Sequence, residues 1–129
     1  FHRWLLHEWP WLRHLHDEHH ESPDALFGTP PLVGVIQIAL CVFLPLYFVE
    51  PVTAAGLTAG MLAGYLAYIG VHWATHHVRE PKLGYLVRAR RRHMLHHFRA
   101  GQTNFGVSTG LWDWVFGTEH LRNPKRLPH

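Results

Sequence analysis

The chain has 129 residues, of which only 16% are charged and 13% are aromatic. Soluble domains usually carry about 25% charged residues, so this balance favours a membrane protein, and the length allows one domain over residues 1–129. The net charge is +3, but every Lys and Arg lies at or before Arg13 or at and after Arg79. A nucleic-acid-binding protein would not leave its apolar middle without cations, so that class is disfavoured.

Two apolar runs dominate the middle of the chain. Residues 1–22 are polar and rich in His and Trp, and a break with four Pro and Gly residues follows at 22–31. Residues 32–49 and 52–70 contain no charged side chain, and each run is long enough to cross a bilayer as a helix. Because only the Glu50-Pro51 turn separates them, we predict a transmembrane hairpin.

Details of the two runs support packed membrane helices. Pro45 predicts a kink in the first run, and Gly56, Gly60 and Gly64 in the second predict a smooth face for a neighbouring helix. The alternative is a pair of buried helices in a soluble protein, but a chain of this size has little left to cover them. We therefore predict an all-α, integral-membrane helical bundle.

The hairpin also predicts a sidedness. It returns the chain to the side from which it entered, and that side then holds every Lys and Arg. Positive charge near span ends stays in the cytoplasm, so the histidine-bearing segments are expected to form a helical cap facing the cytosol. The Glu50-Pro51 turn is expected to face the opposite compartment.

The outstanding feature is the fourteen histidines, because imidazole is the commonest metal-binding side chain. Ten of them fall into four spaced groups. Because positions i, i+3 and i+4 of a helix flank one stripe, we expect each group to converge on a single point or on two adjacent ones. Three protein ligands suffice for a catalytic zinc with an open position, so ten are about right for two metal ions. The groups are His2 and His7; His16, His19 and His20; His72 and His76; and His93, His96 and His97.

The number of spaced groups argues against ordinary packing roles for these histidines. One isolated pair could be interfacial or hydrogen-bonding, but four spaced groups brought to one membrane face favour a dimetal site. His14, His77, His120 and His129 fall outside the pattern, and only His77 is a candidate for a supporting hydrogen bond to a ligand. The single Cys41 can form no disulfide within the chain.

The missing motifs narrow the chemistry. The chain has no HExxH and no serine nucleophile elbow, so hydrolysis is disfavoured. Imidazole suits zinc, copper, iron and nickel alike, and ligand type alone does not choose among them. Beside a membrane the obvious substrate is an acyl chain, and oxidation of its unactivated C–H bonds requires a redox metal and oxygen.

Five segments resemble the fatty acid hydroxylase superfamily, which includes fatty acid 2-hydroxylases, sterol oxidases and desaturases and carotene hydroxylases. They are HRWLLH at 2–7, HDEHH at 16–20, GYLAYIGVHWATH at 64–76, RRRHMLHHF at 90–98 and NFGVSTGLWDWVFGT at 104–118. The four-residue gap between His2 and His7 resembles the fatty acid 2-hydroxylase branch most closely. The resemblance runs from Phe1 to about Thr118.

The resemblance implies a non-haem diiron oxidoreductase of the monooxygenase type. The ten grouped histidines would bind two iron ions, with zinc as an alternative occupant in the isolated protein, and O2 would be the co-substrate. One oxygen atom would enter a lipid C–H bond, at carbon 2 of a fatty acyl chain in the branch that the sequence resembles most closely. A b-type cytochrome or ferredoxin-type partner would supply electrons, and the membrane would be the endoplasmic reticulum in a eukaryote or the inner membrane in a bacterium.

The sequence also departs from the family pattern. Family members usually have spans before the first histidine group, which here begins at residue 2, so we expect the chain to be an excerpt that lacks upstream helices. We expect the aromatic-rich tail from Asn104 to Phe116 to cap the metal site and to pack at the membrane interface, with lining of the substrate tunnel as the alternative. Two alternatives stay open: a family member acting on a sterol, carotenoid or other lipid, including desaturation, and a membrane protein that binds metal without catalysis.

Overall fold

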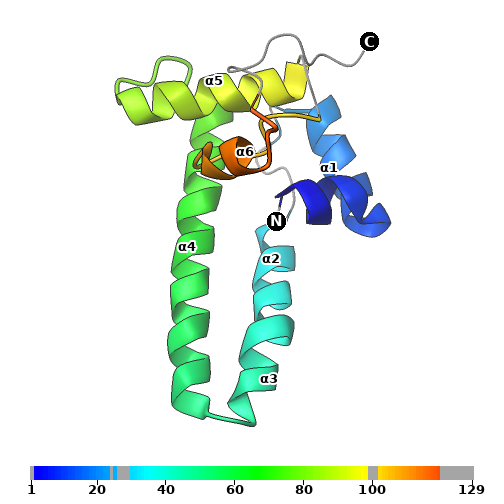
Figure 1. Cartoon of the computed structure of the whole chain (residues 1–129), viewed down its shortest axis with the longest axis vertical. Helices are drawn as coiled ribbons and strands as arrows, with labels where there is room; N and C mark the ends of the chain where they lie inside the picture. Colours follow the sequence, from blue (N-terminus) through cyan, green and yellow to red (C-terminus); the bar gives the residue numbers. More distant parts are fainter. Residues whose placement is uncertain (1, 24, 26–29, 99–101, 120–129) are drawn as a thin grey trace. The chain divides into compact units, whose positions relative to one another are not determined.

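The computed structural model describes residues 2–23, 25, 30–98 and 102–119. Within these ranges every regular element is helical (Figure 1), which confirms the all-α class for the described part of the chain. In chain order the elements, with η marking a π-helix, are η1 (His2–Glu8), α1 (Pro10–Glu21), α2 (Pro31–Ile38), η2 (Ala39–Phe43), α3 (Leu44–Tyr47), α4 (Pro51–His77), α5 (Gly84–Phe98) and α6 (Leu111–Val115).

The chain divides into two compact units. The hairpin unit comprises Thr29–Gly70, and the histidine unit comprises Phe1–Gly28 with Val71–His129. Helix α4 contributes to both, because its first twenty residues belong to the hairpin unit and its last seven to the histidine unit.

In the hairpin unit, α2, η2 and α3 follow one another without interruption, and α4 runs back beside them (Figure 1). The Glu50 carboxylate accepts hydrogen bonds from the backbone N–H groups of Val52 and Thr53. These bonds satisfy two donors of the first turn of α4, which no carbonyl within the helix can reach. The predicted reversal at Glu50 and Pro51 is confirmed.

The first apolar helix differs from the prediction in length and regularity. It ends at Tyr47 rather than Val49, and just before Pro45 the N–H of Leu44 bonds to the carbonyl of Ala39, five residues back. Proline has no N–H to donate, and its ring crowds the carbonyl four residues earlier, so the helix widens locally into a π turn.

Only α4, among the described helices, is long and apolar enough to cross a bilayer by itself. Its 27 residues extend roughly 40 Å at about 1.5 Å per residue. The helix over Pro31–Tyr47 is apolar but shorter. Of the two predicted spans, only the second is therefore long enough in the structure. The first falls short because its helix ends two residues early and includes the π turn.

The close approach within the hairpin unit involves a glycine that the sequence did not single out. A Cβ atom on Gly34 would overlap the Tyr65 ring, whose hydroxyl donates to the Pro31 carbonyl. A Cβ at Gly56, Gly60 or Gly64 would meet no described atom within 4 Å. No described residue thus occupies the predicted smooth face of α4.

The histidine unit has polar side chains where a soluble domain would have an apolar core. Helix α1 buries Leu12, His16 and His19, and α5 buries Ala89, His93 and His96. Both sets follow the i, i+4, i+7 spacing of a single helix face. The largest fully buried side chains of the described chain include His16, His93 and His96, so imidazole takes the place of aliphatic packing here.

Candidate metal centre

Nine of the ten predicted ligands lie in two groups, and within each group one possible ligand atom per residue lies within 4.8 Å of all the others. The five-histidine group consists of His19, His72, His76, His93 and His97, and the four-histidine group consists of His2, His7, His16 and His96. All of these residues belong to the histidine unit.

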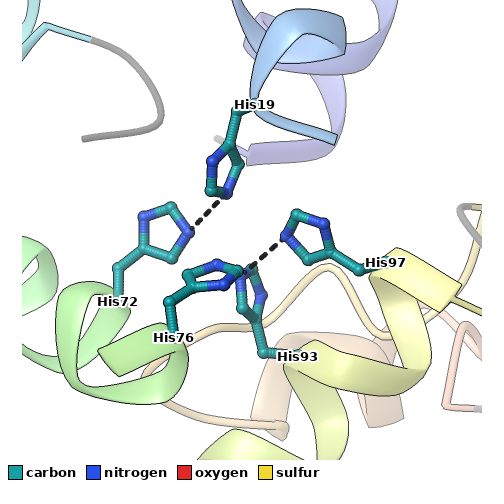
Figure 2. A group of neighbouring side chains, drawn as sticks. All are labelled: His19, His72, His76, His93 and His97. Atoms are coloured by element: carbon teal, nitrogen blue, oxygen red, sulfur yellow. Dashed lines mark hydrogen bonds between the residues drawn. The ribbon is translucent and has the colours of Figure 1, made fainter. Parts of the chain in front are cut away.

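The five-histidine group is built from three helices. Figure 2 shows His19 on α1, His72 and His76 on α4, and His93 and His97 on α5, with their rings turned toward a common centre. The His93 Nε2 atom lies 2.7 Å from His76 Nε2 and 3.0 Å from His97 Nε2. On the other side, His19 Nε2 lies 3.1 Å from His72 Nε2.

The four-histidine group also combines distant parts of the chain. The His2 Nε2 atom from η1 lies 2.9 Å from His16 Nε2 on α1. The His7 Nε2 atom lies 3.1 Å from His96 Nε2 on α5. His16 and His96 are both buried.

His20 belongs to neither group and touches both. Its Nε2 atom lies 3.1 Å from His16 Nε2 in the four-histidine group. Its ring stacks on the ring of His97, in the five-histidine group, with centroids 4.2 Å apart. The structure thus places the tenth predicted ligand between the two groups.

The spacing of the ring nitrogens suits metal ligation. Two imidazole nitrogens that share one ion, each about 2.0–2.1 Å from it, lie roughly 2.9–3.4 Å apart, and the neighbouring Nε2 atoms here lie 2.7–3.1 Å apart. A hydrogen-bonded network accounts for this less well. His93 Nε2 has two Nε2 neighbours, and a neutral ring nitrogen either donates one proton or accepts one.

Hydrogen bonds from the other ring nitrogen orient two members of the four-histidine group. The Nδ1–H of His2 donates to the Phe105 carbonyl, and the Nδ1–H of His96 donates to the Thr103 carbonyl, both at a distance of 2.8 Å. A proton held on Nδ1 leaves the Nε2 lone pair free for a metal ion, and this outer hydrogen bond is a regular feature of metal-binding histidines.

Burial keeps the clustered histidines neutral. It lowers the pKa of His7 and of His19 to about 4, with the neighbouring His20 as the second cause. Burial likewise lowers the pKa of His96 to about 3. Since only neutral imidazole binds a metal ion, these side chains are ready ligands at pH 7.

The histidines outside the pattern lie elsewhere. His14 is exposed and pairs with Glu18 at 3.5 Å. His77 stacks on Trp73, with ring centroids 5.0 Å apart, and no hydrogen bond from it to a grouped histidine is seen in the described part of the chain. His120 and His129 lie outside the described residues.

In the tail from Asn104 to Phe116, Phe105 lies against the four-histidine group, which agrees with the predicted capping, whereas packing of the tail at the membrane interface stays a prediction. The Phe105 ring lies 5.3 Å from the ring of His7 and 5.4 Å from that of His96, between centroids. Sequence reasoning pointed to the segment but to none of its individual residues. Thr103 and Phe105 accept the histidine hydrogen bonds through their backbone carbonyls. Every residue type has such a carbonyl, so the sequence could not indicate these two acceptors.

Comparisons with known proteins show the family to which the chain belongs. The fatty acid hydroxylase family model matches residues 1–118. The chain is 36% identical to fatty acid 2-hydroxylase of Rattus norvegicus over 107 residues, covering 81% of this chain and 28% of the relative. It is 33% identical to a dihydroceramide fatty acyl 2-hydroxylase of Arabidopsis thaliana over 127 residues, covering 91% and 53% respectively.

A ceramide very long chain fatty acid hydroxylase of Saccharomyces cerevisiae is 34% identical over 134 residues, covering 91% of this chain and 33% of the relative. The chain therefore spans about half or less of the length of these relatives. No solved structure matches it significantly. The family match extends over nearly all of the described residues and includes every grouped histidine, and the chain belongs to the fatty acid hydroxylase family.

Proposed function

We propose that this chain is the metal-bearing part of a membrane enzyme that hydroxylates a lipid acyl chain, most specifically carbon 2 of a fatty acyl group. The carrying observation is the convergence of nine imidazoles into two adjacent groups in a member of the fatty acid hydroxylase family. The names of the relatives, which are fatty acid and dihydroceramide fatty acyl 2-hydroxylases, support the choice of carbon.

Two iron ions are the proposed occupants, one for each group, with zinc as an alternative in the isolated protein. The five-histidine and four-histidine groups would each hold one ion through their imidazole nitrogens. His20, whose Nε2 atom lies beside that of His16, would complete the four-histidine site as a fifth ligand. The proposed ligands are then His2, His7, His16, His19, His20, His72, His76, His93, His96 and His97.

Iron would supply the one property that the side chains lack, which is the ability to activate O2 for attack on an unactivated C–H bond. The overall reaction consumes the lipid, O2, two electrons and two protons, and it yields the hydroxylated lipid and water. The two electrons would come from a b-type cytochrome or ferredoxin-type partner. The chain's own part is to hold the two sites through neutral, oriented imidazoles and to cover the four-histidine site with Phe105.

The proposed location is a membrane, with the histidine unit on the cytosolic side. Helix α4 is long and apolar enough to cross a bilayer, and all Lys and Arg lie outside the apolar runs. Cations near span ends favour the cytoplasmic side. The endoplasmic reticulum of a eukaryote or the inner membrane of a bacterium would meet these conditions.

The decisive test is labelling with oxygen-18 gas. Cells that express the protein are compared with cells that express the variant His96→Ala, His97→Ala, which removes one imidazole from each group. Mass spectrometry should find a membrane lipid that has gained one labelled oxygen only in the first culture. The position of the label in that lipid would separate an acyl 2-hydroxylase from an oxygenase of sterols, carotenoids or other lipids.

A control variant makes the comparison specific. His14→Ala removes an exposed histidine that faces Glu18, so labelling should continue at the wild-type level. If the folded, metal-loaded protein produces no labelled lipid even when a b-type cytochrome or ferredoxin is supplied, the hydroxylase proposal is wrong. A metal-binding membrane protein without catalysis would then be the better description.

A further inference from the structure

The two histidine groups differ in how their rings are held. In the four-histidine group, His2 and His96 donate their Nδ1–H to the carbonyls of Phe105 and Thr103. In the five-histidine group, the buried Nδ1 atoms of His19, His93 and His97 have no hydrogen-bond partner among the described residues. The carbonyls of Thr103 and Phe105 therefore orient two rings of the four-histidine group, and three rings of the five-histidine group have no such support among the described residues.

One buried carboxylate holds that segment in place. Asp113 on α6 is 1% exposed, and its Oδ1 atom accepts the N–H of Phe105 at 2.8 Å and the hydroxyl of Thr118 at 2.7 Å. Its Oδ2 atom accepts the N–H of Gly106 at 2.8 Å. Three donors offset the large cost of removing a carboxylate from water.

Backbone hydrogen bonds hold the same segment beside Thr118 and Asp113. The N–H of Asn104 bonds to the Thr118 carbonyl at 2.9 Å, and the N–H of Thr118 bonds to the Asp113 carbonyl at 2.8 Å. Asn104 adopts a positive φ of 53°, which asparagine tolerates better than most residues. The turn at Asn104 aims the carbonyls on either side of it, those of Thr103 and Phe105, at the two histidines.

Asp113 is not placed to bind a metal ion itself. Both of its oxygens already accept hydrogen bonds from the chain, and it is absent from both groups of converging ligand atoms. Asp113 acts on His2 and His96 only indirectly, by holding the segment whose carbonyls, those of Phe105 and Thr103, accept their hydrogen bonds. It is therefore a positioning residue.

We propose that Asp113, by holding residues 103–106, fixes the orientation and tautomer of His2 and His96 and so determines metal affinity at the four-histidine site alone. This inference rests on the proposed dimetal site and does not depend on which lipid is hydroxylated. The two proposed ions would then differ in whether hydrogen bonds from Nδ1 hold the histidines that bind them. Loss of Asp113 should therefore weaken metal binding at one site and spare the other.

The test measures metal binding rather than turnover. Purified, metal-free protein is titrated anaerobically with Fe²⁺ against a competing chelator, and the number and affinity of bound ions are determined. Wild type is expected to bind two ions. Asp113→Asn presents an amide N–H₂ to backbone donors, so one ion should bind 10–100-fold more weakly, the range typical for loss of an outer partner of a metal ligand, while the other ion binds as before.

Paired histidine variants identify the affected ion. In a His2→Ala, His96→Ala background, Asp113→Asn should cause no further loss, because the four-histidine site is already broken. In a His93→Ala, His97→Ala background, Asp113→Asn should weaken the single remaining ion. Thr118→Val should weaken the same ion to a smaller extent, and Thr118→Ser, which keeps the hydroxyl, should restore it.

Glu80→Gln, an exposed charge change in the same unit, is the control and should leave both affinities unchanged. Two wild-type affinities in Asp113→Asn would overturn the inference and leave the proposed function standing. Equal weakening of both ions, or loss of helical circular dichroism, would show a merely structural role and would also overturn it. Failure of wild type to bind two ions would overturn the proposed function together with this inference.

Discussion

At the scale of single residues, the unusual property of the described chain is that several of its fully buried side chains are imidazoles. His16, His93 and His96 are among its largest fully buried side chains, and burial lowers the pKa of each. A buried imidazole is costly when charged. The packing that brings these imidazoles together therefore also keeps them neutral.

This protonation behaviour predicts an unusually acid-resistant metal site. With ordinary histidines, metal affinity would begin to fall near pH 6.5, the usual pKa. Because the pKa of His7 and of His19 lies at about 4, protons compete with the metal only at lower pH. Co²⁺ affinity measured across a pH series should stay constant from pH 8 to about 5 and fall as the pH approaches about 4. A decline that starts near pH 6.5 would contradict the burial of these rings.

His20 offers a second test at this scale. Its Nε2 atom lies 3.1 Å from His16 Nε2, and its ring stacks on His97, so His20→Ala removes a contact from each group. We expect the ion of the four-histidine site to bind at least about tenfold more weakly, with a smaller loss at the other site. Chelator competition measures both affinities.

His14→Ala is the matched control for His20→Ala, because His14 lies on the same helix and its side chain is exposed. The His14→Ala variant should bind both ions with the affinities of the wild type. Unchanged binding in His20→Ala would mean that nine imidazoles suffice and that His20 is only a neighbour of the site.

At the scale of elements, small residues decide how closely the helices approach. Gly34→Ala would place a methyl group on the Tyr65 ring and force it away from the Pro31 carbonyl. Overpacking of this kind typically costs about 1–3 kcal/mol, so the variant should lower the thermal unfolding midpoint. Differential scanning calorimetry of the detergent-solubilised protein checks the change.

Gly60→Ala tests the opposite expectation in the partner helix. An added Cβ there meets no described atom within 4 Å, and alanine is favoured over glycine in a helix interior by about 1 kcal/mol. The variant should be neutral or slightly more stable. If Gly60→Ala is the more damaging change, the face of α4 predicted from its glycine spacing is in use after all.

At the scale of the whole molecule, we expect the stability of the histidine unit to depend on bound metal ions. Among the described residues, its buried apolar side chains are Leu12, Ala89, Phe105 and Val107. An ion present at about a thousand times its dissociation constant stabilises the folded state by about 4 kcal/mol. Metal ions are therefore expected to supply much of the stability that an apolar core supplies elsewhere.

Removal of the metal should show this dependence directly. Chelation is expected to lower the unfolding midpoint of the histidine unit by about 15 °C or more, at about 4–8 °C per kcal/mol for a unit of this size. Circular dichroism at 222 nm follows the transition, and the hairpin helices should keep their signal. Reloading with Zn²⁺ should restore the midpoint. An unchanged midpoint after complete removal would show that packing alone holds the unit.

Much of this organisation could be predicted because it is local. Apolar runs without charge predicted the helices of the hairpin, and the Glu50-Pro51 turn lies where the polarity changes. The end of the first helix at Tyr47 and its π turn could not be placed, since Pro45 predicts a disturbance without its form. The contact of Gly34 with Tyr65 joins two helices and has no local signature.

By itself, the sequence determined the all-α class and the histidines that form the candidate site, because helical spacing of imidazoles is a property of neighbouring residues. Only the tertiary structure decided how they are divided. His16 and His19 from one motif go to different groups, and so do His96 and His97. Adjacent residues point about 100° apart around a helix, and which histidine group each one joins depends on the helices packed against that side. The supporting role of Asp113 is likewise tertiary, because it acts through carbonyls brought near by folding.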